Sequence, residues 1–144
     1  MLVHQLLKNK GDDAVVTVQP TCTVADAAKV LAERKIGSLV VSVDGMYAMG
    51  ILSERDIVRE LARKGASILN DPVEAHMTSR IITCARDDTA DSILKKMTEG
   101  RFRHIPVLEE DQLIGLVTLG DVVKARLQEV SMEKDALEGM IMGH

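Results

Sequence analysis

The stretch Gly50-Ile51-Leu52-Ser53-Glu54-Arg55-Asp56-Ile57-Val58 returns later in the chain as Gly115-Leu116-Val117-Thr118-Leu119-Gly120-Asp121-Val122-Val123. In both copies a glycine is followed by two apolar residues, a hydroxyl residue and, three residues further on, an aspartate. The similarity extends outward, so that Thr17 to Arg59 can be laid over Thr83 to Lys124 with one single-residue shift. A unit of this length rarely buries its apolar face alone. The sequence therefore predicts two copies that pack together as one domain.

The composition fits one core and argues against several classes of protein. With 144 residues, of which 46% are hydrophobic, the chain is long enough for a single well-buried core. A net charge of −4 offers no basic face to nucleic acid, and a single Tyr and a single Phe cannot stack several bases. No apolar run approaches the roughly 20 residues that span a bilayer, and no signal-like segment is present. We therefore expect a cytoplasmic protein without nucleic-acid or membrane partners.

The residues that usually carry metal or covalent chemistry are scattered. Cys22 and Cys84 lack the close spacing of a metal site or redox pair, which predicts two reduced thiols. The four histidines show no ligand spacing. No nucleophile stands beside a base, as a catalytic dyad or triad would need. We therefore expect no metal site and no catalytic residue.

Hydrophobic periodicity predicts the same order of elements in each copy: strand, helix, strand, strand, helix. In the first copy these are a strand at Ala14–Val18, a helix from Thr23 to near Gly37, strands at 38–43 and 49–52 around the turn Asp44-Gly45, and a helix at 54–63 that stops at Gly65. In the second copy they are a strand at Ile81–Cys84, a helix from Thr89 to a left-handed cap at Gly100, strands at 104–108 and 113–117, and a helix from 119 or 120 to about 130.

These elements divide the chain into five parts. They are an N-terminal segment (1–14), repeat 1 (15–65), a linker (66–80) that can hold a short turn of helix, repeat 2 (81–130) and a C-terminal tail (131–144). The tail mixes Met132, Leu137, Met140, Ile141 and Met142 with charges at roughly helical spacing. Two interpretations of the tail stay open: an amphipathic helix for self-association, and disorder.

The repeated hydroxyl–aspartate pairs, Ser53 with Asp56 and Thr118 with Asp121, carry two interpretations. The first is a capping box, in which the hydroxyl and the carboxylate satisfy free backbone N–H groups at a helix start. The second is a ligand site, because a helix N-terminus presents free donors and an ionised Asp can accept both hydroxyls of a ribose. Repetition of the whole context in both halves favours the ligand site.

Motifs in order along the chain carry a resemblance to a known family. They are Thr17-Val18-Gln19-Pro20, Lys35 to Val41 and Gly50 to Asp56 in the first half, and Val73 to Thr78, Arg101 to Val107 and Gly115 to Asp121 in the second. Over Val15 to about Leu127 the chain resembles the tandem CBS-domain proteins, also called Bateman modules. The resemblance implies an α+β fold in which two pseudo-symmetric CBS repeats, each β-α-β-β-α, pack through their small sheets as one module.

The resemblance also implies a set of ligand-binding residues in two clefts. Adenine would sit among apolar strand residues, the Asp would hold the ribose hydroxyls and basic side chains would meet the phosphates. For the first cleft the residues are Thr17, Gly37, Ser38, Leu39, Ser53, Arg55 and Asp56. For the second cleft they are Thr83, Arg103, His104, Ile105, Pro106, Thr118 and Asp121.

The two clefts are not expected to bind identically, because their basic residues differ. Arg55 precedes Asp56, whereas Gly120 precedes Asp121. Arg55 can meet a phosphate or form a surface ion pair with a neighbouring carboxylate. Likewise, Arg103 and His104 are either a phosphate clamp or a solvated strand start.

We therefore expect a stand-alone, non-catalytic regulatory module that binds an adenosine-containing ligand: AMP, ADP, ATP or NAD, with S-adenosylmethionine less favoured. The alternative is a ligand-free structural interaction or dimerisation protein whose hydroxyl–Asp pairs are only helix caps. Modules of this kind usually pair through their helices into homodimers, which implies an interface, or alternatively an intramolecular core, formed by Ile57, Val58, Leu61, Val122, Val123 and Leu127. A separate regulated protein is a further expected partner.

Overall fold

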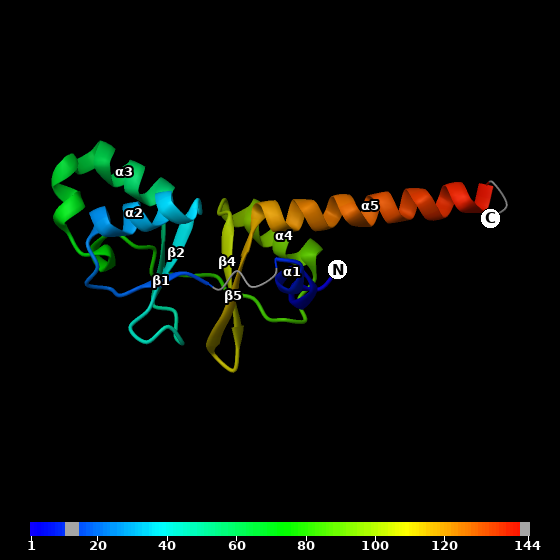
Figure 1. Cartoon of the computed structure of the whole chain (residues 1–144), viewed down its shortest axis with the longest axis horizontal. Helices are drawn as coiled ribbons and strands as arrows, with labels where there is room; N and C mark the ends of the chain where they lie inside the picture. Colours follow the sequence, from blue (N-terminus) through cyan, green and yellow to red (C-terminus); the bar gives the residue numbers. More distant parts are fainter. Residues whose placement is uncertain (11–14, 142–144) are drawn as a thin grey trace. The chain divides into compact units, whose positions relative to one another are not determined.

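The computed structural model describes residues 1–10 and 15–141 and divides the chain into two compact units. Within the described residues, unit 1 comprises residues 1–10, 84–105 and 116–141, and unit 2 comprises residues 15–83 and 106–115. Each unit combines helices with strands (Figure 1). The predicted mixed fold with two small sheets is confirmed.

Unit 2 is built on a three-stranded sheet in the order β1-β2-β3. The strands are β1 (Thr17–Val18), β2 (Ser38–Val41) and β3 (Gly50–Ser53). β1 runs parallel to β2, and β2 runs antiparallel to β3 with Ser38 opposite Ser53. All four residues of β2 are buried, as a central strand covered on both faces should be. The register brings the start of β2 to the end of β3, where a helix begins.

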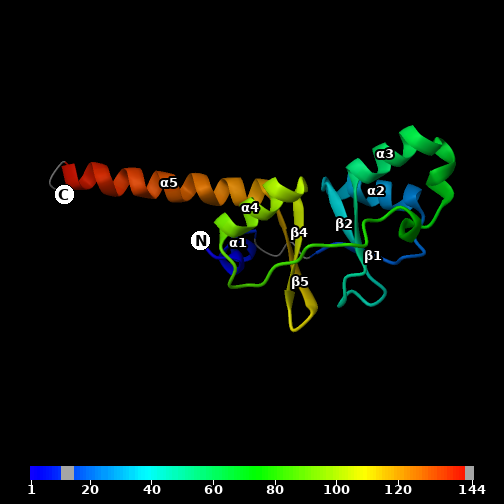
Figure 2. The ribbon, with the colours of Figure 1, turned by 180° about the vertical axis from the view of Figure 1, so that it is seen from behind.

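Two helices pack against this sheet, α2 (Val24–Arg34) and α3 (Glu54–Lys64). They lie side by side beside the strands in Figure 1 and in the reverse view of Figure 2. Thr23 caps α2 by accepting the Asp26 N–H, and α2 ends at a left-handed Lys35. The apolar faces of both helices meet the strands in one cluster. Its buried members are Val24, Ala27, Leu31, Leu39, Val41, Leu52, Ile57, Ile68 and Val73.

The linker holds two short 3₁₀ helices, η1 (Ala66–Asn70) and η2 (Val73–Ala75), which confirms the expected helical turn. The linker also carries a polar cluster around the buried His76 side chain. His76 Nε2 lies 2.8 Å from Asp71 Oδ2, and His76 Nδ1 lies 3.7 Å from Glu60 Oε2. His76 and Glu60 are only 6% and 7% exposed. The cluster thus ties the linker to α3.

Unit 1 combines three helices with parts of two strands. The helices are α1 (Val3–Asn9), α4 (Ala90–Gly100) and α5 (Leu119–Ile141). The strands β4 (His104–Glu109) and β5 (Gln112–Thr118) pair with each other and run from one unit into the other. α1 and α4 both pack against α5. The core of this unit contains Val3, Leu6, Ile93, Met97, Val122 and Ala125.

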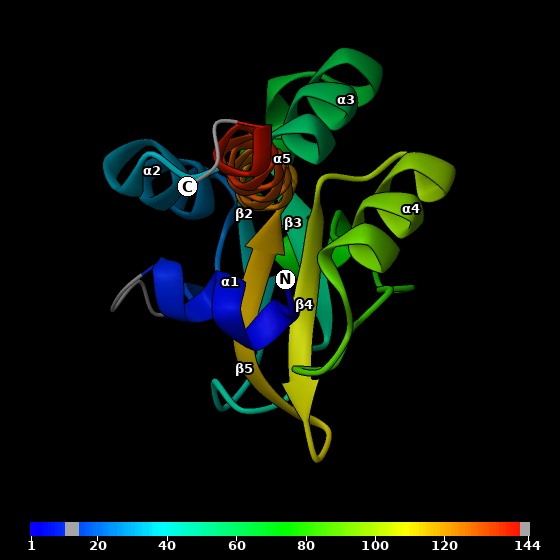
Figure 3. The same ribbon diagram turned by 90° about the vertical axis from the view of Figure 1, so that its right-hand side faces the viewer.

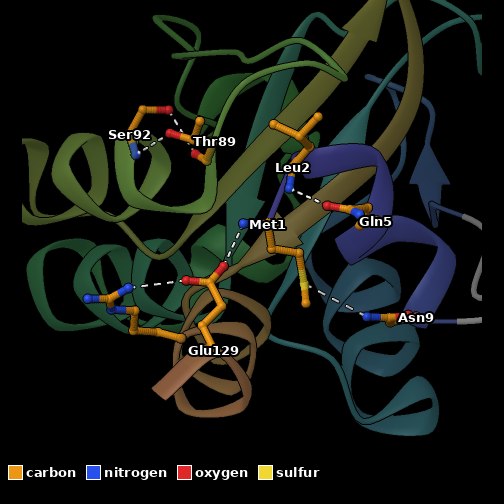
Figure 4. A network of polar contacts seen from close by, with 8 residues as sticks. Met1, Leu2, Gln5, Asn9, Thr89, Ser92 and Glu129 are labelled. Carbon is orange, nitrogen blue, oxygen red and sulfur yellow. Dashed lines mark hydrogen bonds and ion pairs between the residues drawn. The ribbon is translucent and has the colours of Figure 1, made fainter. Parts of the chain in front are cut away.

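The N-terminal segment, for which no element was predicted, forms α1 and is held by contacts at both of its ends. Figure 4 shows the amino group of Met1 paired with Glu129 of α5, and the Leu2 N–H bonded to the Gln5 side chain. The distance from Leu2 N to Gln5 Oε1 is 2.7 Å. At the other end, Lys10 reaches β5 and the start of α5. These contacts give α1 a fixed place on α5.

Two details of the second copy differ from the prediction. The expected strand at Ile81–Cys84 is wrong, because only Cys84 forms a β-bridge and Ile82 is 48% exposed. A strand of this length without a ladder of partners leaves its backbone groups unpaired. The expected cap at Gly100 is also wrong, since Gly100 still belongs to α4 and Arg101 takes the left-handed conformation with φ of 57°.

The hairpins and helix ends follow the prediction more closely. In the first hairpin Asp44 Oδ1 accepts the N–H groups of Met46 and Tyr47, and Gly45 has φ of 79°. The second turns at Glu110 and Asp111, both with positive φ. The predicted stop of α3 at Gly65 is confirmed. The C-terminal tail is helical as far as Ile141, which decides between helix and disorder over those residues, while Met142 lies outside the described residues.

Candidate functional site

The pair Ser53 and Asp56 forms what we call junction A, where β3 passes into α3. The Ser53 N–H donates to Asp56 Oδ2 at 2.9 Å, and the Asp56 N–H donates to Ser53 Oγ at 3.2 Å. This is a complete capping box. Asp56 is only 5% exposed, so the carboxylate is held in one place at the N-terminus of α3.

The pair Thr118 and Asp121 forms junction B, where β5 passes into α5. The Thr118 N–H donates to Asp121 Oδ2 at 2.9 Å, and the Asp121 N–H donates to Thr118 Oγ1 at 3.1 Å. The geometry repeats that of junction A. The predicted capping box is therefore present in both halves, and any ligand contact must come in addition to it.

A second backbone contact is repeated at the two junctions. The Glu54 N–H donates to the Gly37 carbonyl at 2.9 Å, and the Leu119 N–H donates to the Arg103 carbonyl at 2.9 Å. The first residue of each helix is thereby tied to the residue just before the first strand of its hairpin, β2 for α3 and β4 for α5. The chain brings Gly37 to junction A and Arg103 to junction B in the same way.

Junction A contains an unsatisfied polar group. Ser38 is 2% exposed, and its Oγ has no hydrogen-bond partner among the described residues. A buried hydroxyl without a partner costs free energy, so such atoms are uncommon and call for an explanation. Ser38 faces Ser53 across the β2–β3 ladder, and Leu39 beside it is fully buried. The hydroxyl therefore lies next to the strand end that carries the capping box.

Each aspartate also has a cationic partner that was not predicted. Arg59 Nη2 lies 2.9 Å from Asp56 Oδ1 in junction A. In junction B, Lys10 Nζ lies 2.9 Å from Asp121 Oδ2 and donates to the Leu116 carbonyl at 2.8 Å. The Thr118 N–H and the Lys10 ammonium thus both meet Asp121 Oδ2. At Asp56 the contacts are divided, with the Ser53 N–H on Oδ2 and Arg59 on Oδ1.

The sequence offered a signal for only one of these cations. Arg59 stands three residues after Asp56 on the same helix, a spacing that brings side chains together. Lys10 comes from the far end of the chain, and no local pattern connects it with Asp121. Arg55, the basic residue predicted to contact phosphate in the first cleft, is exposed and forms no ion pair in the part of the chain that the structure describes.

The remaining predicted residues lie on β4, on β1 or outside regular secondary structure. His104 begins β4 and is partly buried, while Ile105 and Pro106 are buried. Thr17 lies on β1, which is separated from β3 by the central strand β2. Thr83 is partly buried and lies outside regular secondary structure.

A cavity of about 290 Å³ opens beside Asp121, between α1 and α5. Two cations, Lys10 and Lys124, line it together with two side-chain amides, Asn9 and Gln128. This is a polar lining with donors suited to an anionic or phosphate group. In unit 2, a groove of about 530 Å³ between α2 and α3 is lined mainly by apolar residues and includes Gly37 at its edge.

Comparison with protein families accounts for the repeated junctions. The family model described as CBS domain matches the chain twice, over residues 12–63 and 73–128. The chain belongs to the CBS-domain family. The two matches contain one junction each, so the tandem organisation predicted from the sequence is confirmed.

Solved CBS structures share the fold over most of the chain. A CBS-domain-containing protein from Agrobacterium tumefaciens is 43% identical, with a TM-score of 0.83 over 88% of this chain and 99% of the other. A CBS domain protein from Pyrobaculum aerophilum complexed with AMP is 25% identical, with a TM-score of 0.77 over 92% of this chain and 99% of the other. A curated relative, the mitochondrial CBS domain-containing protein CBSX3 of Arabidopsis thaliana, is 32% identical over 98% of this chain and 72% of its own.

Two other kinds of feature are absent from the described residues. None of their helices combines the length and the apolar character needed to cross a membrane. No group of three or more His, Cys, Asp or Glu side chains among them is arranged to hold a metal ion.

Proposed function

We propose that this CBS pair is a non-catalytic sensor module that binds an adenosine-containing ligand at junctions A and B. The observation that carries the proposal is the buried, unpartnered Ser38 hydroxyl beside a helix N-terminus with a fixed carboxylate. A ligand hydroxyl or ring nitrogen is the kind of group that would satisfy it. The same junction geometry recurs in the second half, which fits a binding element that was kept in both copies.

In junction B the proposed ribose contact is Asp121 Oδ1. Oδ2 already accepts the Thr118 N–H and the Lys10 ammonium, so Oδ1 is the oxygen that can accept a ribose hydroxyl. Ile105 and Pro106 supply apolar surface at the start of β4 for the adenine, and Thr118 contributes its hydroxyl. Arg103 and His104 are the proposed phosphate contacts, and the cavity between α1 and α5 adds Lys10 and Lys124.

In junction A the proposed contacts are the backbone and side chains at the start of β2 together with Asp56. Ser38 and Leu39 lie opposite Ser53 and Leu52 across the β2–β3 ladder, and the Gly37 carbonyl accepts the Glu54 N–H at the start of α3. Because Arg59 holds Asp56 Oδ1, a ribose here must share that oxygen or displace Arg59. Arg55 stays the proposed phosphate contact and Thr17 completes the proposed set at junction A, whereas Thr83 belongs to the proposed set at junction B. We expect junction A to bind more weakly than junction B.

The proposed ligands are AMP, ADP, ATP and NAD, with S-adenosylmethionine less favoured. The AMP complex of the Pyrobaculum relative supports an adenine nucleotide, since that protein shares the fold over nearly its whole length. A ligand can change the shape or partner affinity of the module only as far as its affinity differs between the two states. The proposed readout is a change in binding to a separate regulated protein.

The location and assembly of the protein are further parts of the proposal. We propose a homodimer in the cytoplasm. Two free cysteines are consistent with a reducing compartment, although the Arabidopsis relative is named as mitochondrial. Of the residues predicted to face a second copy, Ile57 and Val122 are buried within their own units, whereas Val58, Val123 and Leu127 are exposed and open to a partner.

Calorimetric titration of the purified protein with AMP, ATP, NAD and S-adenosylmethionine tests the proposal. Asp121→Asn should weaken binding about 10- to 100-fold, because hydrogen bonds to a charged group contribute roughly 1.5–3 kcal/mol. The matched control is Asp26→Asn. Asp26 is likewise the third residue of a helix with a hydroxyl N-cap, but its helix, α2, belongs to neither junction. Equal affinities in all three proteins would overturn the ribose role of Asp121.

The alternative function is a ligand-free structural or dimerisation protein. One observation favours it. Each aspartate already completes a capping box and pairs with a cation, so its position is explained without a ligand. This alternative predicts no heat with any of the four compounds while the fold is intact. It also predicts that Asp121→Ala lowers the free energy of unfolding by about 1 kcal/mol, as the loss of a helix cap does.

A further inference from the structure

α5 carries a row of apolar side chains that the molecule leaves exposed. Val123, Leu127, Val130, Leu137 and Ile141 are 44%, 66%, 48%, 58% and 77% exposed. They recur at alternating steps of four and three residues, and Lys134 occupies the one remaining place in the series. Such a series is the a/d pattern of a coiled coil. We call these six positions the α5 seam.

The seam is a different face of α5 from the one that packs within unit 1. The packed face contains the buried residues Val122 and Ala125, and Glu129 on the same side pairs with the amino group of Met1 (Figure 4). At about 100° of rotation per residue, the centre of the seam lies roughly 120° around the helix from that face. α1 and α4 are the neighbours of α5 within unit 1 (Figure 3), and neither covers the seam.

The polar residue within the seam indicates what the partner is. A single Lys at an a position lowers stability but fixes the register and number of helices in a coiled coil. If two copies of α5 paired in parallel, Lys134 would face Lys134, and Glu133 would face Glu138 on both sides. All three contacts are repulsive.

The antiparallel arrangement removes most of this repulsion. With Lys134 opposite Val130 and Leu127 opposite Leu137, Lys124 of each copy lies beside Glu138 of the other. This gives two attractive pairs, and the one unfavourable contact left is Glu133 with Glu133. Lys124 and Glu138 are both exposed. Within its own helix Glu138 lies 3.9 Å from Lys134, a long and solvated contact that leaves its carboxylate able to meet Lys124 of the second copy. The charge pattern is therefore complementary to a second, reversed copy of the same helix.

We propose that two copies of this chain pair through the α5 seam as a short antiparallel coiled coil. The pairing would cover the five exposed apolar side chains of each copy, and burial of such surface is the main driving force of association. The six seam residues take no part in junction A or junction B. Lys124, which pairs with Glu138 across the coil, is the one residue shared with the proposed phosphate contacts.

Sedimentation analysis of the full chain over a range of concentrations, with the variants Glu138→Lys and Lys124→Glu/Glu138→Lys, tests the proposal. The wild type should dimerise, Glu138→Lys should raise the dimer dissociation constant about tenfold, and the double variant should restore it. A parallel coil predicts the opposite for Glu138→Lys, since the Glu133–Glu138 repulsion would become attraction. The matched control is Asp135→Lys, the same charge change on an exposed residue outside the seam, which should leave the constant unchanged.

A second variant separates this interface from any other. Leu137→Glu places a charge in the centre of the seam at a side chain that is already 58% exposed, so the chain should still fold. It should abolish the dimer, with circular dichroism confirming that the helices remain. A monomeric wild type, a dimer that survives Leu137→Glu, or tighter pairing in Glu138→Lys would overturn the proposal. Calorimetry on Glu138→Lys should give wild-type nucleotide binding, so failure here and failure of the sensor function can be told apart.

Discussion

The ammonium of Lys10 lies 2.9 Å from the carboxylate of Asp121, joining the end of α1 to the start of α5. In the absence of ligand, Lys10 balances a carboxylate that is about four-fifths buried. Under the proposed function, the phosphates of a nucleotide at junction B would offer Lys10 a second anionic partner. Lys10 therefore connects the N-terminal helix with the proposed ribose site.

Replacing Lys10 by Gln should change the preference among ligands. The variant removes a competitor for the Asp121 carboxylate, so adenosine should bind at least as tightly as to the wild type. It also removes a phosphate partner, so ATP should bind more weakly. The ratio of ATP affinity to adenosine affinity should fall at least about fivefold, measured by calorimetry.

Lys8→Gln is the matched control for this variant. Lys8 lies on the same helix, is exposed and carries the same charge. It should leave both affinities unchanged. If Lys10→Gln lowers the affinities for adenosine and ATP equally, Lys10 serves only to position Asp121.

Gly50→Ala should destabilise unit 2 by about 1–3 kcal/mol, the range for overpacking a close contact. A Cβ at this position would lie 2.8 Å from the Thr78 carbonyl oxygen and 2.7 Å from Met77 Sδ. The backbone carbonyl cannot move away without breaking the Ile51–Thr78 bridge. Chemical denaturation measures the change.

Gly139→Ala provides the comparison for the Gly50 variant. No atom lies within 4 Å of a Cβ built at Gly139, which is in α5. Because Ala is the better helix former by about 1 kcal/mol, this substitution should increase the helical content. A Gly50→Ala protein as stable as Gly139→Ala would contradict the crowding seen at β3.

His76→Leu should lower the free energy of unfolding by about 1–3 kcal/mol. The imidazole lies between Asp71 and Glu60, and its removal leaves the buried Glu60 carboxylate with one polar neighbour fewer. Leaving a buried charged acceptor short of one polar partner costs about 1–3 kcal/mol. Arg59 and Arg63, each 3.6 Å from Glu60 Oε1, remain as partners of the carboxylate. Asp71→Asn, at a side chain that is 45% exposed, should cost much less. Equal losses in urea denaturation would refute the polar cluster around His76 as the cause.

Cys84 should resist alkylation in the folded protein. Burial, with a smaller contribution from Asp88, raises the pKa of its thiol from 9.0 to about 12. The thiolate is the reactive form, so at pH 8 iodoacetamide should modify Cys84 more slowly than the partly buried Cys22, as followed by mass spectrometry. Rapid modification of native Cys84 would contradict its burial.

The same shift in pKa gives a sign for the pH dependence of stability. The folded thiol keeps its proton to higher pH than the unfolded one, so its stabilising contribution is complete below pH 9. Above pH 9 the unfolded state loses the proton first, and stability falls as the pH rises towards 12. Cys84→Ala should remove this part of the alkaline loss of stability.

Local patterns were sufficient to predict most of the fold. Hydroxyl caps at Thr23, Ser53 and Thr118 and the Asp44-Gly45 turn act within a few residues, so their effects can be inferred from spacing alone. The strand expected at Ile81–Cys84 failed because a strand also needs a partner ladder, and an apolar run does not reveal whether one is available.

The candidate site was predicted only in part, again because spacing along the chain reveals local contacts but not tertiary ones. Both capping boxes follow from a three-residue spacing, and the sequence identified them. The Lys10–Asp121 pair joins residues that lie far apart in the sequence. The lack of a hydrogen-bond partner for Ser38 Oγ depends on which residues surround β2. Contacts of these two kinds are decided by tertiary packing and have no local signature.

α5 is one continuous helix from Leu119 to Ile141, with Asp121 in its first turn. At 1.5 Å per residue it is about 33 Å long. A rigid rod of this length acts as a lever: a tilt of about 5° at the Asp121 end would move the Ile141 end by about 3 Å, more than half of one helical turn. A change of a fraction of an ångström where the aspartate sits is therefore magnified at the far tip, where a neighbouring molecule could detect it.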